Sequence, residues 1–239
     1  MSRPMTILSG DARGAAGAWR HAVYLLGWDV AIRPPRHWRT RATESVVVLR
    51  YTVLSTLAGP LLAVAAPDGL RHLHLLPEAD AWQLTLARLA AAASPERPQT
   101  AGETSAPPIL TEDPAAFNPL ARQLGEYFAG ARKTFDLPLA PRGTTFQQAV
   151  WRQLSTIGYG QIRSYRRLAA DLGSPAAARA VGQAAAQNPL LILIPCHRLL
   201  GSDGRLVGFS AGTELKARLL RLEGHVLAAG QRIRPPRLF

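Results

Sequence analysis

The chain has 239 residues, of which 47% are hydrophobic and 18% charged, a balance typical of a soluble globular protein with a substantial core. The single cysteine excludes an internal disulfide and a multi-cysteine zinc site, and its free thiol suits a reducing, cytoplasmic compartment. No apolar run reaches the roughly 18 residues that a membrane span needs, so we expect no membrane partner. The formal net charge of +12 favours a polyanionic partner, commonly nucleic acid, although an Arg-rich genome can produce the same excess.

Residues 1–47 differ in composition from the rest, with seven Arg against three acidic residues and no sustained period of 2 or 3.6. We interpret them as an irregular basic extension. Two hypotheses stay open for it. It is either a basic arm that adds phosphate contacts or the product of a start assigned too far upstream. The second is slightly favoured, because the regular pattern begins near Val46–Val48.

A small αβ domain is predicted over residues 48–135. Its strands and helices, in chain order, are the strands Val46–Ser55, Leu61–Ala66 and Leu70–Leu75, and the helices Ala79–Ala93 and Asp113–Ala129. Residues 67–69 (Pro-Asp-Gly) are a turn between the second and third strands, and Asp113 caps the last helix. The polar, Pro-rich stretch 94–113 is predicted as a loop, and 136–143 as an extended linker.

A mostly helical second domain is predicted over residues 144–227. Its helices are Thr145–Leu154, Ser164–Leu172, Ala176–Gln187 and Gly212–Leu222. The break at 173–175 (Gly-Ser-Pro) makes the second and third a helix-turn-helix pattern, although two ordinary packed helices would show it too. Leu190–Ile194 is predicted as a buried strand, 201–204 as a hairpin turn in a small wing, and 228–239 as a basic tail.

The lone cysteine, Cys196, follows the predicted strand and precedes His197 and Arg198. Pro195 stiffens the approach to the thiol, and cationic neighbours lower a thiol pKa, which favours the reactive thiolate. A lone cysteine is, however, more often a buried small hydrophobe, and neighbouring side chains on an extended segment point opposite ways. These residues alone leave both interpretations open.

The wider stretch around Cys196 resembles one family. Asn188-Pro189, LLILIPCHRLLGSDGRLVGFSAG and ELKARLLRLEGH are similar to the methylated-DNA–protein-cysteine methyltransferases, also called O6-alkylguanine-DNA alkyltransferases, which carry an Ile/Val-Pro-Cys-His-Arg-Val/Ile core. The resemblance is specific over residues 144–225 and looser over 49–141. Residues 1–47 and the tail after Val226 have no counterpart. The fold class we expect is α+β, with a short antiparallel sheet in a ribonuclease-H-like first domain and a winged-helix-like second domain.

The resemblance implies that Cys196 accepts an alkyl group from O6-alkylguanine, and from O4-alkylthymine, in DNA, irreversibly and once per molecule. His197 would activate the thiol through a water, and Glu223 would orient and polarise His197. Asn188 would hydrogen-bond the loop around the reactive residue. The plainer alternatives are an exposed acid at a helix end for Glu223 and a turn former before Pro189 for Asn188.

The alkylated base must leave the duplex to reach a thiol, since it is otherwise stacked and paired. By resemblance, Tyr165 crowds the phosphate of the flipped nucleotide, and Arg179 fills the gap left in the stack. Ala177 and Ala178 help to make the second helix of the pair slim enough for the minor groove of double-stranded DNA, although helix propensity also explains them. We expect the protein to act as a monomer.

By the same resemblance, the substrate pocket would be lined by Tyr165, Pro195, Phe209 and Ser210. Phe209 stands where some members have Tyr, Ala211 where many have Gly, and Leu191 where some have Pro. These differences weaken the expectation that bulky alkyl groups are accepted. Lys216 matches a lysine of many members, or is an ordinary solvated charge. No cofactor is expected, and no metal, because the cysteines that bind zinc in some relatives are missing.

Two alternative functions use the same residues differently. An alkyltransferase-like protein would recognise lesions without removing them, but such relatives lack the acceptor cysteine that this chain retains. A cysteine hydrolase would turn over repeatedly, but its His usually comes from far along the chain rather than from the next residue.

Overall fold

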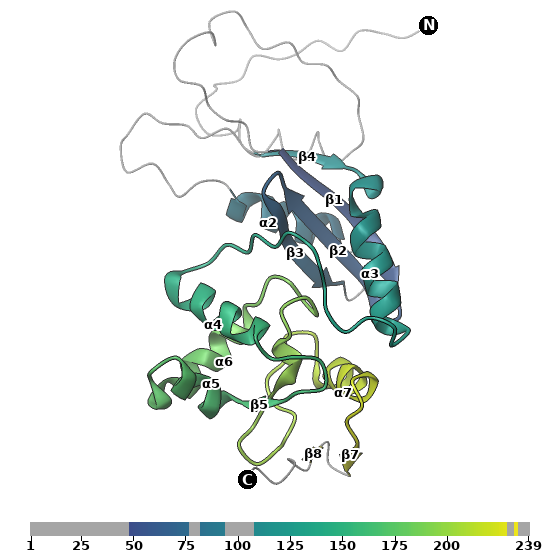
Figure 1. The fold of residues 1–239 in the computed structure, drawn as a ribbon. Coiled ribbons are helices and arrows are strands. Elements are labelled where there is room, and N and C mark those ends of the chain that lie inside the picture. Colours follow the sequence, from purple (N-terminus) through teal and green to yellow (C-terminus); the bar gives the residue numbers. More distant parts are fainter. Residues whose placement is uncertain (1–47, 77–81, 94–107, 229–231, 234–239) are drawn as a thin grey trace, which may run out of the picture.

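The computed structural model describes residues 48–76, 82–93, 108–228 and 232–233. The hypotheses on residues 1–47, on the start of the helix predicted at Ala79, on the loop over 94–107 and on most of the tail concern residues outside these ranges. Figure 1 shows an N-terminal half with a sheet between helices, above a C-terminal half that is mostly helical. The α+β class predicted from the sequence is confirmed.

The sheet has the strand order β3-β2-β1-β4. Its antiparallel part is formed by β1 (Val48–Thr56), β2 (Gly59–Ala66) and β3 (Gly69–Leu75). The predicted turn between β2 and β3 is confirmed: Gly69 has a φ angle of 140°, and a Cβ there would lie 2.5 Å from the carbonyl oxygen of Pro138. Both the backbone angle and the close approach therefore require glycine at this turn.

A fourth strand, β4 (Ile109–Glu112), runs parallel to β1 in the stretch that was predicted as a loop. The prediction was wrong here because a four-residue strand that follows two prolines is too short to show an alternating pattern. Val48 lies opposite Ile109 at the start of the pairing. The sheet is therefore mixed rather than purely antiparallel.

Alternate side chains of β2 pack into two different cores. Leu62 belongs to a small core with Leu86 of α2 (Trp82–Ala93) on one face of the sheet. Leu61 belongs to a larger core with residues of α3 (Asn118–Phe128) on the other face. The larger core continues into the C-terminal half, so the two halves share buried side chains.

The helix predicted from Asp113 begins as expected but is divided. The Asp113 carboxylate accepts a hydrogen bond from the backbone N–H of Ala116 (3.2 Å) and caps the 3-10 turn η2 (Pro114–Phe117), which leads into α3. The linker after α3 lies along the sheet, where the backbone N–H of Ala140 donates to the carbonyl of Leu70 (2.8 Å).

The helices of the C-terminal half are α4 (Thr145–Ser155), α5 (Tyr165–Asp171), η3 (Pro175–Ala177), α6 (Ala178–Ala186) and α7 (Thr213–Leu222). Local capping fixes the starts of α4 and α5: Thr144 and Gln147 form a reciprocal capping box for α4, and the Ser164 side chain caps α5. The Trp151 indole of α4 donates to the carbonyl of Ala184 in α6 (2.9 Å). The predicted helix-turn-helix pair, α5 and α6, is therefore braced by α4.

Short strands complete this half: β5 (Arg163–Ser164) pairs with β6 (Leu199–Leu200), and β7 (Leu227–Ala228) with β8 (Arg232–Ile233). Ile233 is buried in one cluster with Leu220 of α7. Residues 232–233, which were expected within a basic tail, thus pack against the C-terminal half. Two-residue strands carry no pattern from which this could be predicted.

The apolar run Leu190–Ile194 is a turn, not the predicted strand. Only Leu190 makes a β-bridge, with Leu73 of β3. The chain then folds back on itself, so that the Ile194 N–H donates to the Leu190 carbonyl (2.9 Å) and Ile192 takes a φ angle of 71°. The prediction was wrong because a segment buried on all sides is apolar throughout, whatever its backbone conformation.

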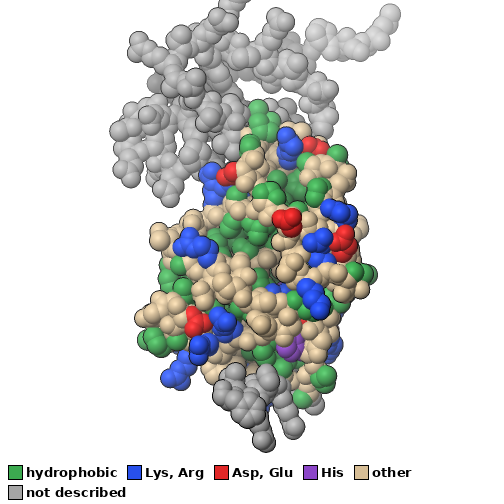
Figure 2. All heavy atoms as spheres, viewed as in Figure 1, with side chains coloured by type: hydrophobic (Ala, Val, Ile, Leu, Met, Phe, Trp, Pro, Cys, Tyr) green, Lys and Arg blue, Asp and Glu red, His purple; other side chains and the backbone are tan. Residues whose placement is uncertain are grey.

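Among the residues described, no helix is long and apolar enough to cross a membrane. Figure 2 shows that Lys and Arg side chains scatter over both halves of the visible face, among acidic and apolar ones. The positive charge is therefore spread on this face rather than gathered in one patch.

Candidate active site

Cys196 opens the 3-10 turn η4 (Cys196–Arg198) and is 4% exposed. The buried Pro195 precedes it, and two backbone bonds close the turn: the Cys196 N–H donates to Ile194 (2.8 Å) and the Arg198 N–H to Pro195 (3.0 Å). A tight turn rather than an extended segment therefore sets the directions of the three side chains that follow Pro195.

Asn188 holds this turn from inside. Its side-chain Nδ2 donates to the Ile194 carbonyl (2.8 Å) and lies 3.1 Å from Cys196 Sγ, while its Oδ1 accepts from the Leu190 N–H (3.0 Å). Asn188 is 6% exposed. Its side chain therefore provides hydrogen bonds to buried backbone groups that have no neighbouring strand to pair with. The structure thus brings Asn188 directly to the thiol.

Burial raises the pKa of the Cys196 thiol, and the hydrogen bond from Asn188 and the charge of Lys216 oppose this only in part. The expectation that the cationic neighbours lower this pKa was wrong. The Arg198 guanidinium is turned toward Glu223, with Nη2 2.8 Å from Oε1, and does not act on the thiol. The resting thiol therefore keeps its proton at neutral pH and needs a base to become a thiolate.

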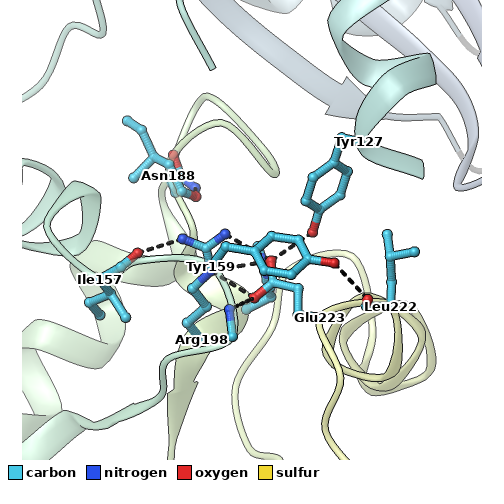
Figure 3. A network of polar contacts seen from close by, with 10 residues as sticks. Tyr127, Ile157, Tyr159, Asn188, Arg198, Leu222 and Glu223 are labelled. Atoms are coloured by element: carbon cyan, nitrogen blue, oxygen red, sulfur yellow. Dashed lines mark hydrogen bonds and ion pairs between the residues drawn. The ribbon is translucent and has the colours of Figure 1, made fainter. Parts of the chain in front are cut away.

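Glu223 follows α7 and lies at the centre of the polar network in Figure 3. It is 5% exposed, so it is not an exposed acid at a helix end. Its carboxylate accepts hydrogen bonds from Tyr127, Gly160, His197 and Arg198. Burial alone would raise the pKa of Glu223, but the hydrogen bonds and charges of His197 and Arg198 hold it well below its usual range. Glu223 is therefore a carboxylate at neutral pH.

His197 is fully buried, and its Nε2 lies 3.0 Å from Glu223 Oε1. Because a carboxylate only accepts, Nε2 carries the proton and Nδ1 is the unprotonated nitrogen. Nδ1 is buried and has no hydrogen-bond partner among the described residues. Burial lowers the pKa of His197 despite the nearby Glu223, so the imidazole is neutral at neutral pH. A neutral imidazole with one free nitrogen is suited to act as a general base.

Tyr127 was missed by the sequence reasoning. It lies on α3, 96 residues from Glu223, and its hydroxyl donates to Glu223 Oε1 (2.8 Å, Figure 3). The side chain is fully buried, and burial raises its pKa, so the hydroxyl stays protonated. The hydroxyl of a buried tyrosine usually has a hydrogen-bond partner, but nothing near Tyr127 in the sequence indicates which residue that partner is.

We expect Tyr127→Phe to lower the free energy of unfolding by about 1.5–3 kcal/mol, the usual worth of a hydrogen bond to a charged group. The reason is that Glu223 stays charged and buried but loses one donor. Urea unfolding would measure the change, with Tyr51→Phe on β1 as the control, expected to stay within about 0.5 kcal/mol. Equal stability of Tyr127→Phe and the parent would contradict this role.

Tyr165, the first residue of α5, joins the helix-turn-helix pair to the loop before α7. Its hydroxyl lies within hydrogen-bond distance of the carbonyls of Val207 (2.9 Å) and Gly208 (2.8 Å), which share its one proton, and a Cβ on Gly182 of α6 would lie 3.8 Å from its ring. Lys216 Nζ lies 5.7 Å from the ring centroid. Lys216 is fully buried rather than solvated, and burial lowers its pKa to about 8.

The other predicted pocket residues take different places. The Phe209 ring stands edge-on to His197, with centroids 6.5 Å apart, and Ser210 is exposed on the following loop. A cavity of about 400 Å³ beside the reactive turn is lined by His74, Leu75, Asn188, Leu191, Ser210 and Ala211. Of the four predicted pocket residues, Ser210 alone lines this cavity, and the sequence reasoning missed His74 and Leu75.

The predicted DNA-contacting residues lie on the helix-turn-helix pair. Arg179 is exposed on α6, and Ala177 and Ala178 are half-buried where this helix begins. No hydrogen bond or ion pair joins Arg179 to Cys196, His197 or Glu223 within the described part of the chain. In that same part, no group of three His, Cys, Asp or Glu side chains could hold a metal ion.

Two family models match the chain. They are described as 6-O-methylguanine DNA methyltransferase, ribonuclease-like domain, over residues 49–141, and 6-O-methylguanine DNA methyltransferase, DNA binding domain, over residues 145–225. The fold and the site, with a buried cysteine beside a His–Glu pair in a helix-turn-helix half, thus agree with these models and assign the chain to the class of 6-O-methylguanine DNA methyltransferases.

Named relatives agree. The methylated-DNA–protein-cysteine methyltransferase of Methanosarcina barkeri is 38% identical over 173 residues, which cover 72% of this chain and 96% of the relative. The constitutive enzyme of Bacillus subtilis is 55% identical over 103 residues, 43% of this chain and 62% of that one. The crystal structure of Mycobacterium tuberculosis OGT in complex with DNA is similar with a TM-score of 0.58 and 37% identity, covering 73% of this chain and 92% of that one. The chain belongs to the methylated-DNA–protein-cysteine methyltransferase family.

Proposed function

We propose that this protein repairs DNA by transferring a methyl or other alkyl group from O6-alkylguanine, and from O4-alkylthymine, to Cys196, and that each molecule acts once. One observation carries the proposal. The buried Cys196 thiol is bonded to Asn188 and followed by a neutral His197 that is bonded to Glu223 through one ring nitrogen and free at the other. Membership of the family supports the same reaction.

The reaction is a single displacement at the alkyl carbon. His197 accepts the Cys196 proton at Nδ1, through a bridging water, and the thiolate attacks the carbon. The C–S bond forms as the C–O6 bond breaks, and the electron pair of that bond stays with the guanine. The guanine takes up a proton from water, and the His197 imidazolium returns the thiol proton to water, so the protons balance. Glu223 stabilises the imidazolium that His197 becomes. The thiolate is a poor leaving group from the neutral thioether that forms, so the thiol is not regenerated.

We place double-stranded DNA against the helix-turn-helix pair, with α6 in the minor groove. The small side chains of Ala177 and Ala178 keep the start of α6 slim, and the neighbouring Arg179 is exposed. Arg179 would occupy the gap left by the extruded base, and Tyr165 would guide that base toward Cys196. One lesion engages one protein molecule, so we expect the protein to act as a monomer.

Arg179→Ala is expected to slow transfer from duplex DNA by about tenfold or more, because unstacking a base costs a few kcal/mol that the arginine would no longer offset. Transfer from single-stranded DNA, where the base is already unpaired, should slow less. Single-turnover rates on both substrates measure this. Arg122→Ala removes the same charge from the exposed side of α3 and serves as the control. An equal loss on both substrates would mean that Arg179 contributes only charge.

Nucleoside analysis of the DNA tests the proposed function. With a duplex that carries one O6-methylguanine, we expect each added protein molecule to convert one O6-methylguanine to guanine and then stop. A protein that only recognises lesions would bind the duplex and leave the base unchanged. A hydrolytic enzyme would continue beyond one conversion per chain. Either result would overturn the proposal.

We also propose a cytoplasmic location, because a reactive free thiol stays reduced there. Cell fractionation tests this, and recovery of the protein from an oxidising compartment would contradict it.

A further inference from the structure

The cavity beside the reactive turn is walled from both halves of the chain. β3 contributes His74 and Leu75, and the C-terminal half contributes Asn188, Leu191, Ser210 and Ala211. Asn188 connects the cavity to the chemistry, because its Nδ2 lies 3.1 Å from Cys196 Sγ. Cys196 itself does not line the cavity, so Asn188 is the residue that joins the cavity to the thiol.

β3 is fixed against the reactive turn by two backbone hydrogen bonds. The Leu73 N–H donates to the Pro189 carbonyl (2.7 Å), and the Leu191 N–H donates to the Leu73 carbonyl (3.0 Å). Leu73 is fully buried, and its neighbour His74 lines the cavity instead. His74 is thus held at a set place relative to Leu191 by the backbone and not by a mobile loop.

His74 adds an imidazole to the polar side chains that line the cavity, which are Asn188 and the exposed Ser210. The Asn188 amide is already bonded to Leu190, Ile194 and Cys196. His74 Nε2 pairs with His72 Nδ1 at 3.4 Å, with the two rings stacked. Burial lowers the pKa of His74, so the ring is neutral. When His72 donates in this pair, the proton of His74 is on Nδ1, where it can serve another acceptor.

We propose that this cavity receives the outer end of the alkyl group during transfer, and that His74 selects alkyl groups ending in a hydroxyl over purely apolar groups of the same size. This inference rests on the proposed function. A hydroxyl gives the imidazole a hydrogen-bond partner, whereas an apolar end displaces water from the imidazole and leaves its N–H without a partner. The N-terminal half thereby takes part in the choice of substrate.

Duplexes with a single O6-methylguanine, O6-(2-hydroxyethyl)guanine or O6-propylguanine test this, because the last two alkyl groups have the same number of non-hydrogen atoms. The measured quantity is the ratio of single-turnover rate constants, hydroxyethyl over propyl, within each protein. We expect this ratio to fall about 3- to 10-fold in His74→Leu relative to the parent, the worth of one hydrogen bond. His74→Met, with a flexible apolar side chain, should show the same fall.

His74→Asn keeps a hydrogen-bonding side chain and should retain a ratio above that of His74→Leu. His225→Leu makes the same change outside the cavity and should keep the ratio of the parent. If the parent transfers methyl but His74→Leu and His74→Met keep its ratio, the role of His74 is wrong. If the parent transfers no methyl group to Cys196, the proposed function itself is wrong.

Discussion

Replacing Glu223 by Gln is expected to slow alkyl transfer by about 100-fold or more and to lower the free energy of unfolding by about 3–5 kcal/mol. His197 would lose the negative charge that stabilises its protonated form, so it would become a weaker base for the thiol. The Arg198 guanidinium, 6% exposed, would stay buried without the carboxylate that it now contacts through two of its nitrogens. Single-turnover rates and urea unfolding measure the two effects.

Glu214→Gln is the matched control for this change. Glu214 is an exposed acid on the same helix, α7, so its loss should change the stability by less than about 0.5 kcal/mol and leave the transfer rate unaltered. Rates should be compared at a temperature where both variants are folded. A folded Glu223→Gln that transfers at the parental rate would show that His197 works without Glu223.

The second large effect is expected for Asn188→Ala, with transfer slowed about 10- to 100-fold near neutral pH and the rate–pH profile moved to higher pH. The Asn188 hydrogen bond lowers the pKa of Cys196 against burial, so its removal raises that pKa further. Below the pKa, the thiolate fraction falls tenfold for each pH unit by which the pKa rises. A hydrogen bond to a charged group is worth about 1.5–3 kcal/mol, which sets the size of the effect.

The rate–pH profile separates this role from a structural one. Asn188→Ala also leaves the Ile194 carbonyl and the Leu190 N–H without their side-chain partner, which lowers stability. Partial unfolding would reduce the reactive fraction without moving the profile along the pH axis. Gln187→Ala, an exposed amide one residue earlier, is the control. An unmoved profile in Asn188→Ala would mean that Asn188 only holds the loop.

The parts of the fold that could be predicted are those with local signals. The helix starts predicted at Thr145 and Ser164 are confirmed, and hydrogen bonds within one turn fix them, from the Thr144–Gln147 box and from Ser164. β4 and the turn over Leu190–Ile194 could not be predicted, because partners far along the chain decide them. β4 exists through its pairing with β1, and the turn through the Asn188 side chain and Leu73.

The site, like the fold, has residues that the sequence indicates and residues that only the tertiary structure shows. The motif around Cys196 and the resemblance indicated His197, Asn188 and Glu223, although the charge argument from the neighbours was wrong. Arg198 lies two residues from the thiol, yet its guanidinium is turned to Glu223, and only the tertiary structure shows this. The contributions of the N-terminal half, which are Tyr127 and His74, depend on packing between the two halves and leave no local signal.

The stoichiometry of labelling tests the central claim most directly. The protein is incubated with an excess of duplex DNA that carries O6-methylguanine with a radiolabelled methyl group, and the label on protein is counted and located by peptide mapping. The account predicts one label per chain, on Cys196, and none on Cys196→Ala. Label that exceeds one per chain, or label that persists on Cys196→Ala, would contradict it.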